Sequence, residues 1–240
     1  MNLDIVLPCY NPIDSWVETI ISSYQTLCKR LPDTNINIYL VNDGSGKKIK
    51  DSDIEYLNAN IKSFHYISYY FNRGKGYALR KGVKKTKSEI VIFTDVDFPY
   101  EEDSLLKVYN VLVHKEADIC LGIRDESYYE KVPPERVKLS KFLRYITRKL
   151  LSIPVNDTQC GLKGFNQRGK DIFLKTSIKR YLFDIEFIFL AARTQGIIFK
   201  PIEVKLKPGI VFSKINFKLL FKEILNFIFI FIRFRLIKSK

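Results

Sequence analysis

The chain has 240 residues, of which 46% are hydrophobic, so it is neither disordered nor too short to bury a substantial core. Its formal net charge of +14 is unevenly spread: residues 1–135 hold 17 Lys and Arg against 20 Asp and Glu, and residues 136–240 hold 23 against 6. The second half is therefore expected to face an anionic partner, either a membrane surface or nucleic acid.

Apolar and β-branched runs predict five strands, and the stretches between them predict four helices. The strands are expected at Leu3–Leu7, Ile36–Val41, Phe64–Phe71, Glu89–Thr94 and Ala117–Leu121, and the helices at Trp16–Arg30, Asp53–Asn60, Tyr77–Lys85 and Ser104–His114. This alternation predicts an α/β fold with a mostly parallel sheet flanked by helices, whose functional loops follow the strands.

Two of these loops carry unusual residues. The first strand ends in Pro8-Cys9-Tyr10-Asn11-Pro12, an extended loop whose tyrosine ring could stack on a base. The second ends in Val41-Asn42-Asp43-Gly44-Ser45, a tight turn that leaves a carboxylate at the sheet edge. Each of these segments is, on its own, also a common turn.

The next two strand ends favour a phosphate-bearing ligand. Gly74-Lys75-Gly76 opens a helix and offers backbone N–H groups and a cation to an anion, without the spacing of a P-loop or of a dinucleotide fingerprint. The fourth strand runs into Asp95 and Asp97 before a proline stops it, which suggests a divalent cation with phosphates completing its shell. A solvated turn with a helix cap near Glu101 is the alternative.

Four cysteines, at positions 9, 28, 120 and 160, show no metal-ligand spacing, which favours free thiols in a reducing compartment. No signal peptide is expected, because a strand-like run begins almost at once.

In this order, the motifs resemble those of the family-2 glycosyltransferases of GT-A fold. The segments Asn156–Phe165 and Tyr181–Glu186 further resemble the dolichyl- or polyprenyl-phosphate hexosyltransferases, the glucosyl-transferring branch most of all. Asn42 departs from the family pattern, which has aspartate there, and this makes the nucleotide preference less certain. Pro99, where mannosyl-transferring relatives can have a glutamine, favours the glucosyl type.

The resemblance implies roles for the strand-end residues. The donor, a nucleotide sugar and preferably a UDP-sugar, would be bound by Pro8, Tyr10, Asn11, Asn42, Asp43, Lys75, Gly76, Asp95 and Val96. Asp95 and Asp97 would hold Mg²⁺ or Mn²⁺ on the diphosphate, and Asp97 and Asp157 would be the catalytic residues, with Asp157 orienting a substrate or serving as a base.

The basic half is predicted to bind the acceptor. Residues 134–149 predict an amphipathic helix on which Arg136 and Ser140 share a face. With Arg124, these residues could clamp a lipid phosphate, and the resemblance adds Gln159. A basic, solvated helix face is the alternative.

The segment 217–237 is strongly apolar but too often interrupted by charge to span a bilayer. We expect it to lie on an anionic membrane, although packing on the core or in a dimer interface stays open. Its phenylalanines form an apolar belt and do not alternate with cations, which disfavours nucleic acid.

The predicted organisation is a GT-A domain at 1–212, with a nucleotide-sugar half at 1–123 and an acceptor half at 124–212, followed by an amphipathic segment at 213–240. The predicted activity is inverting transfer of a hexose, glucose by the resemblance, to a polyprenyl or dolichyl phosphate at the cytoplasmic face of a membrane. A flippase or a second copy of the chain could be a partner. A glycan acceptor and a non-enzymatic membrane- or nucleic-acid-binding protein are the alternatives.

Overall fold

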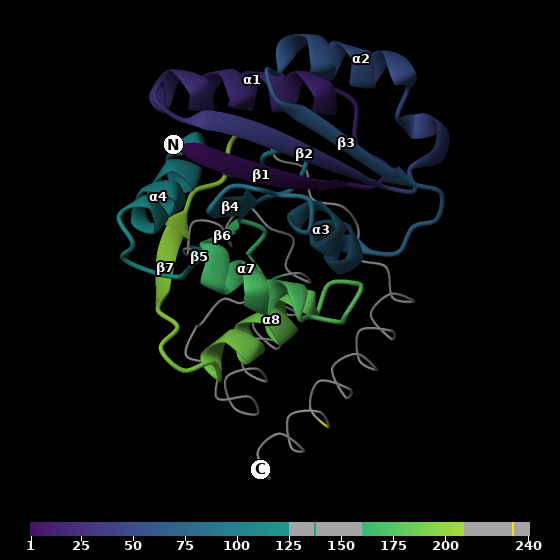
Figure 1. Cartoon of the computed structure of the whole chain (residues 1–240). Coiled ribbons are helices and arrows are strands. Elements are labelled where there is room, and N and C mark those ends of the chain that lie inside the picture. Colours follow the sequence, from purple (N-terminus) through teal and green to yellow (C-terminus); the bar gives the residue numbers. More distant parts are fainter. Residues whose placement is uncertain (125–136, 138–159, 209–231, 233–240) are drawn as a thin grey trace.

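The computed structural model describes residues 1–124, 137, 160–208 and 232. In this part of the chain, a sheet of seven strands in the order β3-β2-β1-β4-β6-β5-β7 carries helices on both faces (Figure 1). The strands are β1 (Asn2–Cys9), β2 (Asn35–Asp43), β3 (Phe64–Tyr69), β4 (Ile90–Phe93), β5 (Ile119–Arg124), β6 (Lys163–Phe165) and β7 (Phe199–Val204). The helices are α1 (Trp16–Arg30), α2 (Asp51–Asn60), α3 (Lys75–Val83), α4 (Glu102–Val113), α7 (Gln167–Leu174) and α8 (Phe183–Ala192), with a 3₁₀ turn η1 (Gly46–Lys48).

All nine elements expected from the sequence are present, and the mostly parallel sheet is confirmed. The differences are at element ends: β5 continues to Arg124, three residues beyond the predicted end, and β3 stops at Tyr69, two residues early, with Tyr70 and Phe71 beyond it strongly exposed. β6, α7, α8 and β7 were not predicted from the sequence. All four cysteines are free, as expected.

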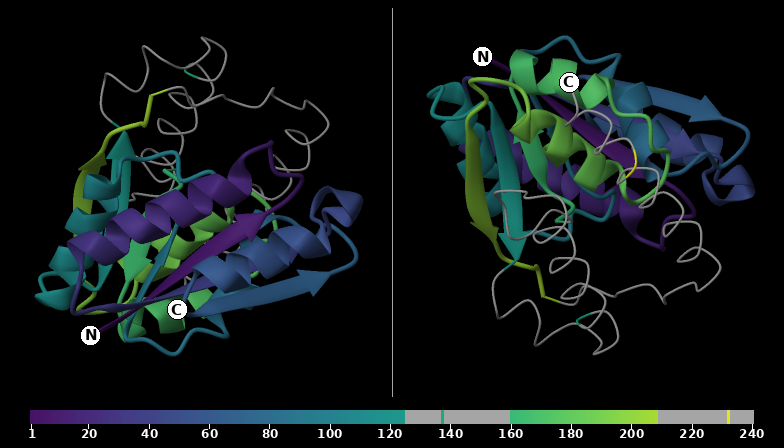
Figure 2. Two further views of the ribbon diagram at one scale, coloured as in Figure 1. Left: turned by 90° about the horizontal axis from the view of Figure 1, so that it is seen from above. Right: turned by 90° about the horizontal axis from the view of Figure 1, so that it is seen from below.

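The alternation of side chains along β1 explains the two layers of helices. Leu3, Ile5 and Leu7 point to a core shared with α1, α2 and α4, whereas Val6 points to a core shared with α3, α7 and α8. Figure 2 shows the same arrangement from above and below, with α1 and α2 on one face and α7 and α8 on the other. Both faces being covered leaves the sheet edges for binding.

β6 is the antiparallel strand of the sheet. Its Lys163 pairs with Phe93 of β4 on one side and with Leu121 of β5 on the other. Because β6 runs against both neighbours, its amino end meets their carboxyl ends. The residues just before β6 therefore arrive at the edge where β4 delivers Asp95.

Asp4, near the opposite edge of the sheet, anchors the turn before β4. Its fully buried carboxylate accepts hydrogen bonds from the Lys87 and Ser88 backbone N–H groups (2.7 and 2.9 Å), the Ser88 hydroxyl and Asn37. Asp4→Ala leaves these donors unpaired, and we expect it to lower the free energy of unfolding by about 3 kcal/mol. Urea denaturation followed by circular dichroism measures this change. An unaltered midpoint would show that the turn does not depend on Asp4.

Candidate active site

The loops after β1 and β2 are tied to each other. The Asn11 backbone N–H donates to the Ser45 hydroxyl (3.0 Å), and Asn11 adopts a positive φ of 47°, which asparagine tolerates well. Tyr10, just before it, is 52% exposed, so its ring is available to a ligand. The Asn42 amide accepts from the Ser45 N–H and donates to the Tyr66 hydroxyl, both at 2.8 Å. Both ends of the Asn42 amide are therefore engaged by the protein itself.

Asp43 holds the loop that leads to α3. Its buried carboxylate accepts from the backbone N–H groups of Arg73 (2.7 Å) and Gly74 (2.8 Å) and from the Asn72 side chain (2.9 Å). The predicted donor-binding carboxylate thus also fixes the start of α3. Asp43 keeps at most one acceptor position for a ligand, because a carboxylate can accept about four hydrogen bonds and three are already made.

The predicted helix start at Gly-Lys-Gly is present, with Gly74 as N-cap at φ +102° and α3 beginning at Lys75. One of the N–H groups of this first turn is not available to an anion, because the Tyr77 N–H donates to the Lys179 carbonyl (3.0 Å). An anion at this helix end would therefore meet the Lys75 ammonium and the N–H groups before Tyr77.

Gly76 allows α3 to pack directly against the segment before α8. A Cβ built on Gly76 would lie 2.7 Å from both the Ile178 carbonyl oxygen and the Phe183 Cβ. We expect Gly76→Ala to lower the free energy of unfolding by about 2 kcal/mol, since neither backbone nor buried ring can easily yield. Thermal melting of the two proteins measures the loss. An unchanged melting temperature would mean that α3 and the segment before α8 separate at little cost.

Asp95 and Asp97 lie at the end of β4, in a turn closed by a hydrogen bond from the Phe98 N–H to the Asp95 carbonyl (3.0 Å). The Lys75 Nζ lies 2.5 Å from Asp95 Oδ1, so α3 and the β4 end meet. Phe98 is buried and has a φ of +41°, a strained conformation for a bulky residue. Such strain next to an acidic pair is typical of functional turns.

The electrostatics of this turn favour a further cation. Burial and the neighbouring Asp95 charge raise the pKa of Asp97, although Lys75 and Lys207 oppose the shift. Burial lowers the pKa of Lys75, but the carboxylates of Asp95 and Asp184 outweigh it, so the pKa of Lys75 is raised above its ordinary value. Lys75 is therefore a firm positive charge at this edge.

The chemistry of the donor set fits a hard divalent ion. Two half-buried carboxylates separated by one residue supply oxygen ligands, and no described cation forms a salt bridge with Asp97. Within the described ranges no group of three His, Cys, Asp or Glu side chains could hold a metal. Mg²⁺ or Mn²⁺ bound here would need oxygens from a diphosphate or water as well.

The second half of the chain reaches this turn through Gly161, which lies against Asp95 and Tyr100. A Cβ on Gly161 would lie 2.5 Å from Asp95 Oδ2, and the Gly161 N–H donates to the Tyr100 hydroxyl (3.2 Å). Burial raises the pKa of Tyr100 well above its ordinary value, and the Arg124 charge opposes the shift. Arg124 closes β5 at this same edge.

The geometry thus brings Tyr10, Asp43, Lys75, the acidic pair and Arg124 to one edge of the sheet. The family profile described as "Glycosyl transferase family 2" matches residues 4–172. The chain belongs to glycosyl transferase family 2.

Relatives within family 2 agree with the finer resemblance. The chain is 26% identical over 208 residues to a dolichyl-phosphate beta-glucosyltransferase of Dictyostelium discoideum, and 24% identical over 206 residues to one of Homo sapiens. These matches cover 80% and 79% of this chain and 62% of each relative. The chain therefore spans under two thirds of the length of these relatives.

The fold is that of solved glycosyltransferases. Glucosyl-3-phosphoglycerate synthase from Mycobacterium tuberculosis, in complex with Mn²⁺, UDP and glucosyl-3-phosphoglycerate, aligns with a TM-score of 0.62 and 14% identity. The alignment covers 91% of this chain and 74% of that one. The same enzyme with Mg²⁺ and UDP aligns with a TM-score of 0.61 and 16% identity. The GT-A prediction is thereby confirmed for the described sheet and helices.

Part of the predicted site lies outside the described residues. This holds for Arg136, Ser140, Asp157, Gln159 and the segment 213–240 apart from Ile232. In the part that is described, no helix has the length and apolar character needed to cross a bilayer.

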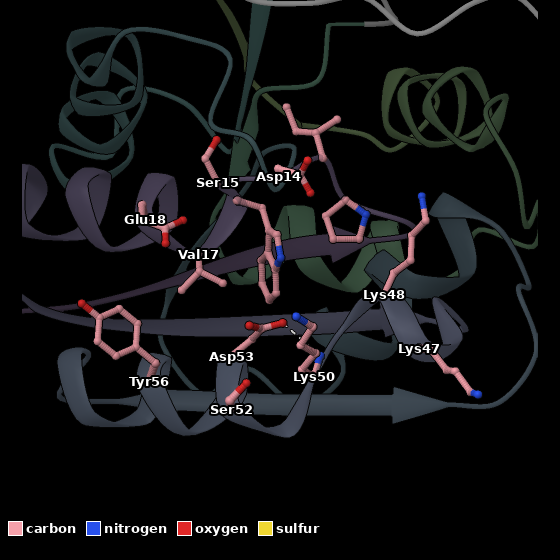
Figure 3. A pocket seen from close by; sticks show the side chains of 13 residues that line it. Asp14, Ser15, Val17, Glu18, Lys47, Lys48, Lys50, Ser52, Asp53 and Tyr56 are labelled. Carbon is pink, nitrogen blue, oxygen red and sulfur yellow. Dashed lines mark hydrogen bonds between the residues drawn. The ribbon is translucent and has the colours of Figure 1, made fainter.

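A surface hollow of about 600 Å³ lies beside this family-2 site, not at it (Figure 3). It is framed by the start of α1 and the start of α2, and none of Lys75, Asp95 and Asp97 lines it. Three carboxylates, those of Asp14, Glu18 and Asp53, and three lysines, Lys47, Lys48 and Lys50, line it. Such a balance of charge gives no preference for a phosphate.

Lys163, Asp184 and Glu186 lie within the motif segments Asn156–Phe165 and Tyr181–Glu186, but no role was predicted for them from the sequence. Glu186 is buried and accepts from the Ser177 and Ile178 N–H groups, both at 2.8 Å, which fixes the segment before α8 to α8 itself. Lys163 and Asp184 form a buried ion pair. The sequence signal for Glu186 and for the ion pair was a charged residue inside an otherwise apolar run.

Proposed function

We propose that the protein is an inverting hexosyltransferase that moves glucose from a UDP-sugar to a dolichyl or other polyprenyl phosphate. The names of its family-2 relatives support the acceptor and the sugar. The observation that carries the proposal is the joining of Lys75 to Asp95 by a 2.5 Å ion pair, with Asp97 beside them, at the carboxyl edge of the sheet. A nucleoside diphosphate bound there would meet both a cation and an acidic pair.

The donor half of the site is supplied by residues 1–123. The exposed Tyr10 ring would stack on the base, and Asp43 would keep the loop before α3 in place beside it. Lys75 would face the diphosphate. Asp95 and Asp97 would hold Mg²⁺ or Mn²⁺, which when bound supplies positive charge to the departing diphosphate. Solved structures of the same fold contain these ions together with UDP.

In the reaction, an acceptor phosphate oxygen bonds to the anomeric carbon while the bond from that carbon to the diphosphate oxygen breaks. The electron pair leaves with the nucleoside diphosphate, and one displacement inverts the anomeric centre to β. A phosphate acceptor is already ionised near neutral pH, so it needs little help from a base. Arg124, with Arg136, Ser140 and Gln159, would hold the acceptor phosphate, and Asp157 would orient it.

A product assay tests the proposal. The full chain is incubated with Mn²⁺, radiolabelled UDP-glucose and a short polyprenyl phosphate, and the mixture is extracted with organic solvent. We expect label in the organic phase that is released by mild acid, as a glycosyl phosphate would be. Label that stays in water, or that enters an oligosaccharide, would contradict the lipid-phosphate acceptor.

We also propose that residues 213–240 bind anionic lipid at the cytoplasmic face of a membrane. Basic residues near an anionic surface each contribute about 1 kcal/mol, so loss of the segment should end binding. We expect a chain truncated after Lys214 to stay at the bottom of a density gradient when the full chain floats with vesicles containing phosphatidylserine. Equal flotation of both proteins would place the membrane contact elsewhere.

A further inference from the structure

A buried ion pair lies beneath the active-site edge. The Lys163 side chain is fully buried and the Asp184 side chain is 9% exposed, and Lys163 Nζ lies 2.8 Å from Asp184 Oδ1. Burial raises the pKa of Asp184, and the ammonium groups of Lys163 and then Lys75 oppose the shift. Replacing such a pair by apolar residues is often neutral or stabilising, so fold stability is a weak reason for its presence.

Lys163, one member of the pair, is connected to Asp95 through the backbone of residues 160 and 161. Lys163 Nζ also donates to the Cys160 carbonyl at 2.5 Å. The next residue, Gly161, lies so close to Asp95 that an added Cβ would be 2.5 Å from Oδ2. Lys163 therefore fixes the stretch of backbone against which one carboxylate oxygen rests.

Asp184, the other member of the pair, is connected to the Asp95 carboxylate through contacts of α8 with α3. Asp184 lies in the first turn of α8, next to Phe183, whose Cβ meets Gly76 of α3. Lys75, the residue before Gly76, donates to Asp95 Oδ1. Contacts that start at Lys163 therefore reach Asp95 Oδ2, and contacts that start at Asp184 reach Asp95 Oδ1.

We propose that Lys163 and Asp184 are positioning residues that set the orientation of the Asp95 carboxylate for the metal and the diphosphate. This inference rests on the proposed function, because Asp95 is assigned there to the metal. Groups that orient a metal ligand typically change metal affinity about 10- to 100-fold when they are removed. A pair that served the fold alone would change stability without such a change in affinity.

The test compares Asp184→Asn with Asp118→Asn. Asp118 is a matched control, because its buried carboxylate is paired with Arg168 (3.1 Å) and accepts from the Asn166 side chain and the Ile198 N–H. It lies just before β5, at the opposite edge of the sheet from Asp95. Melting temperature reports the fold, and calorimetric titration with UDP in the presence of Mn²⁺ reports the site.

We expect both variants to melt at lower temperature, and only Asp184→Asn to raise the Kd of UDP with Mn²⁺, by at least about 10-fold. A Kd unchanged in Asp184→Asn, or raised equally in Asp118→Asn, would overturn the inference. Failure of the unaltered protein to bind UDP with Mn²⁺ would instead overturn the proposed function.

The double variant Lys163→Met/Asp184→Leu separates positioning from stability, and it carries the test if Asp184→Asn does not fold. Apolar residues of similar volume remove the unpaired buried charge, so the melting temperature should return towards that of the unaltered protein. The Kd should stay raised, because the Cys160 carbonyl has lost its donor. Recovery of both quantities would show that the pair serves only the fold.

Discussion

Asp97→Asn should lower metal-dependent sugar transfer by about 10³-fold with the fold intact. The substitution keeps the size of the side chain but removes the negative charge that a divalent cation needs. Metal charge on a leaving diphosphate contributes several kcal/mol to the transition state, and each 1.4 kcal/mol is tenfold in rate. Initial rates over a range of Mn²⁺ concentrations, with circular dichroism of both proteins, measure the effect.

Asp103→Asn is the control for this experiment. Asp103 lies nearby in the first turn of α4, but its carboxylate is exposed and forms a surface salt bridge with Arg30. Surface pairs contribute under about 1 kcal/mol, so this variant should keep its activity. If Asp97→Asn retained most of its activity, or if both variants lost it equally, the metal assignment would be wrong.

Gly161→Ala is expected to lower kcat/KM on the order of 100-fold, although it adds only one methyl group. That methyl would lie 2.5 Å from Asp95 Oδ2, and the carboxylate must move to admit it. A displacement of about 1 Å in an active site can cost two orders of magnitude in rate. The atom that moves is the end of a side chain, so the free energy of unfolding should change by less than about 1 kcal/mol.

Two measurements separate the effect on the site from an effect on the fold. Steady-state kinetics with varied UDP-sugar should show the loss, and urea denaturation should give midpoints close to those of the unaltered protein. A variant that is strongly destabilised, or one that is fully active, would contradict the close contact between Gly161 and Asp95.

The sequence was most informative where local patterns decide the structure. The apolar run before Asp95 and the Gly-Lys-Gly helix start each depend on neighbouring residues alone, and each is present, although β4 ends at Phe93 and not at the predicted stop, Pro99. Alternation of strands and helices then implied the parallel sheet. Since carboxyl ends of parallel strands share an edge, the meeting of Lys75 with Asp95 also follows from the pattern.

What the sequence could not give depends on contacts between distant segments. β6 has three residues, too few to show a period, and its place arises from pairing with β5, about 40 residues earlier, and with β4, about 70 residues earlier. α8 is buried on all sides, its two acidic residues Asp184 and Glu186 included, so it lacks an amphipathic pattern. The partners of Asn42 and Lys163 likewise come from tertiary packing, which no single motif reveals.

The direction of β6 has a consequence for how the protein can be re-engineered. β5 ends at Arg124, and the chain returns to the same edge of the sheet at Leu162. There the Gly122 N–H of β5 donates to the Leu162 carbonyl (3.0 Å). The stretch between Arg124 and Leu162 starts and ends at neighbouring points of the sheet, so strand geometry does not dictate its length. If the acceptor is bound as proposed above, a cassette from a family-2 glycosyltransferase grafted there would alter acceptor choice while β1, β2 and β4 keep their register.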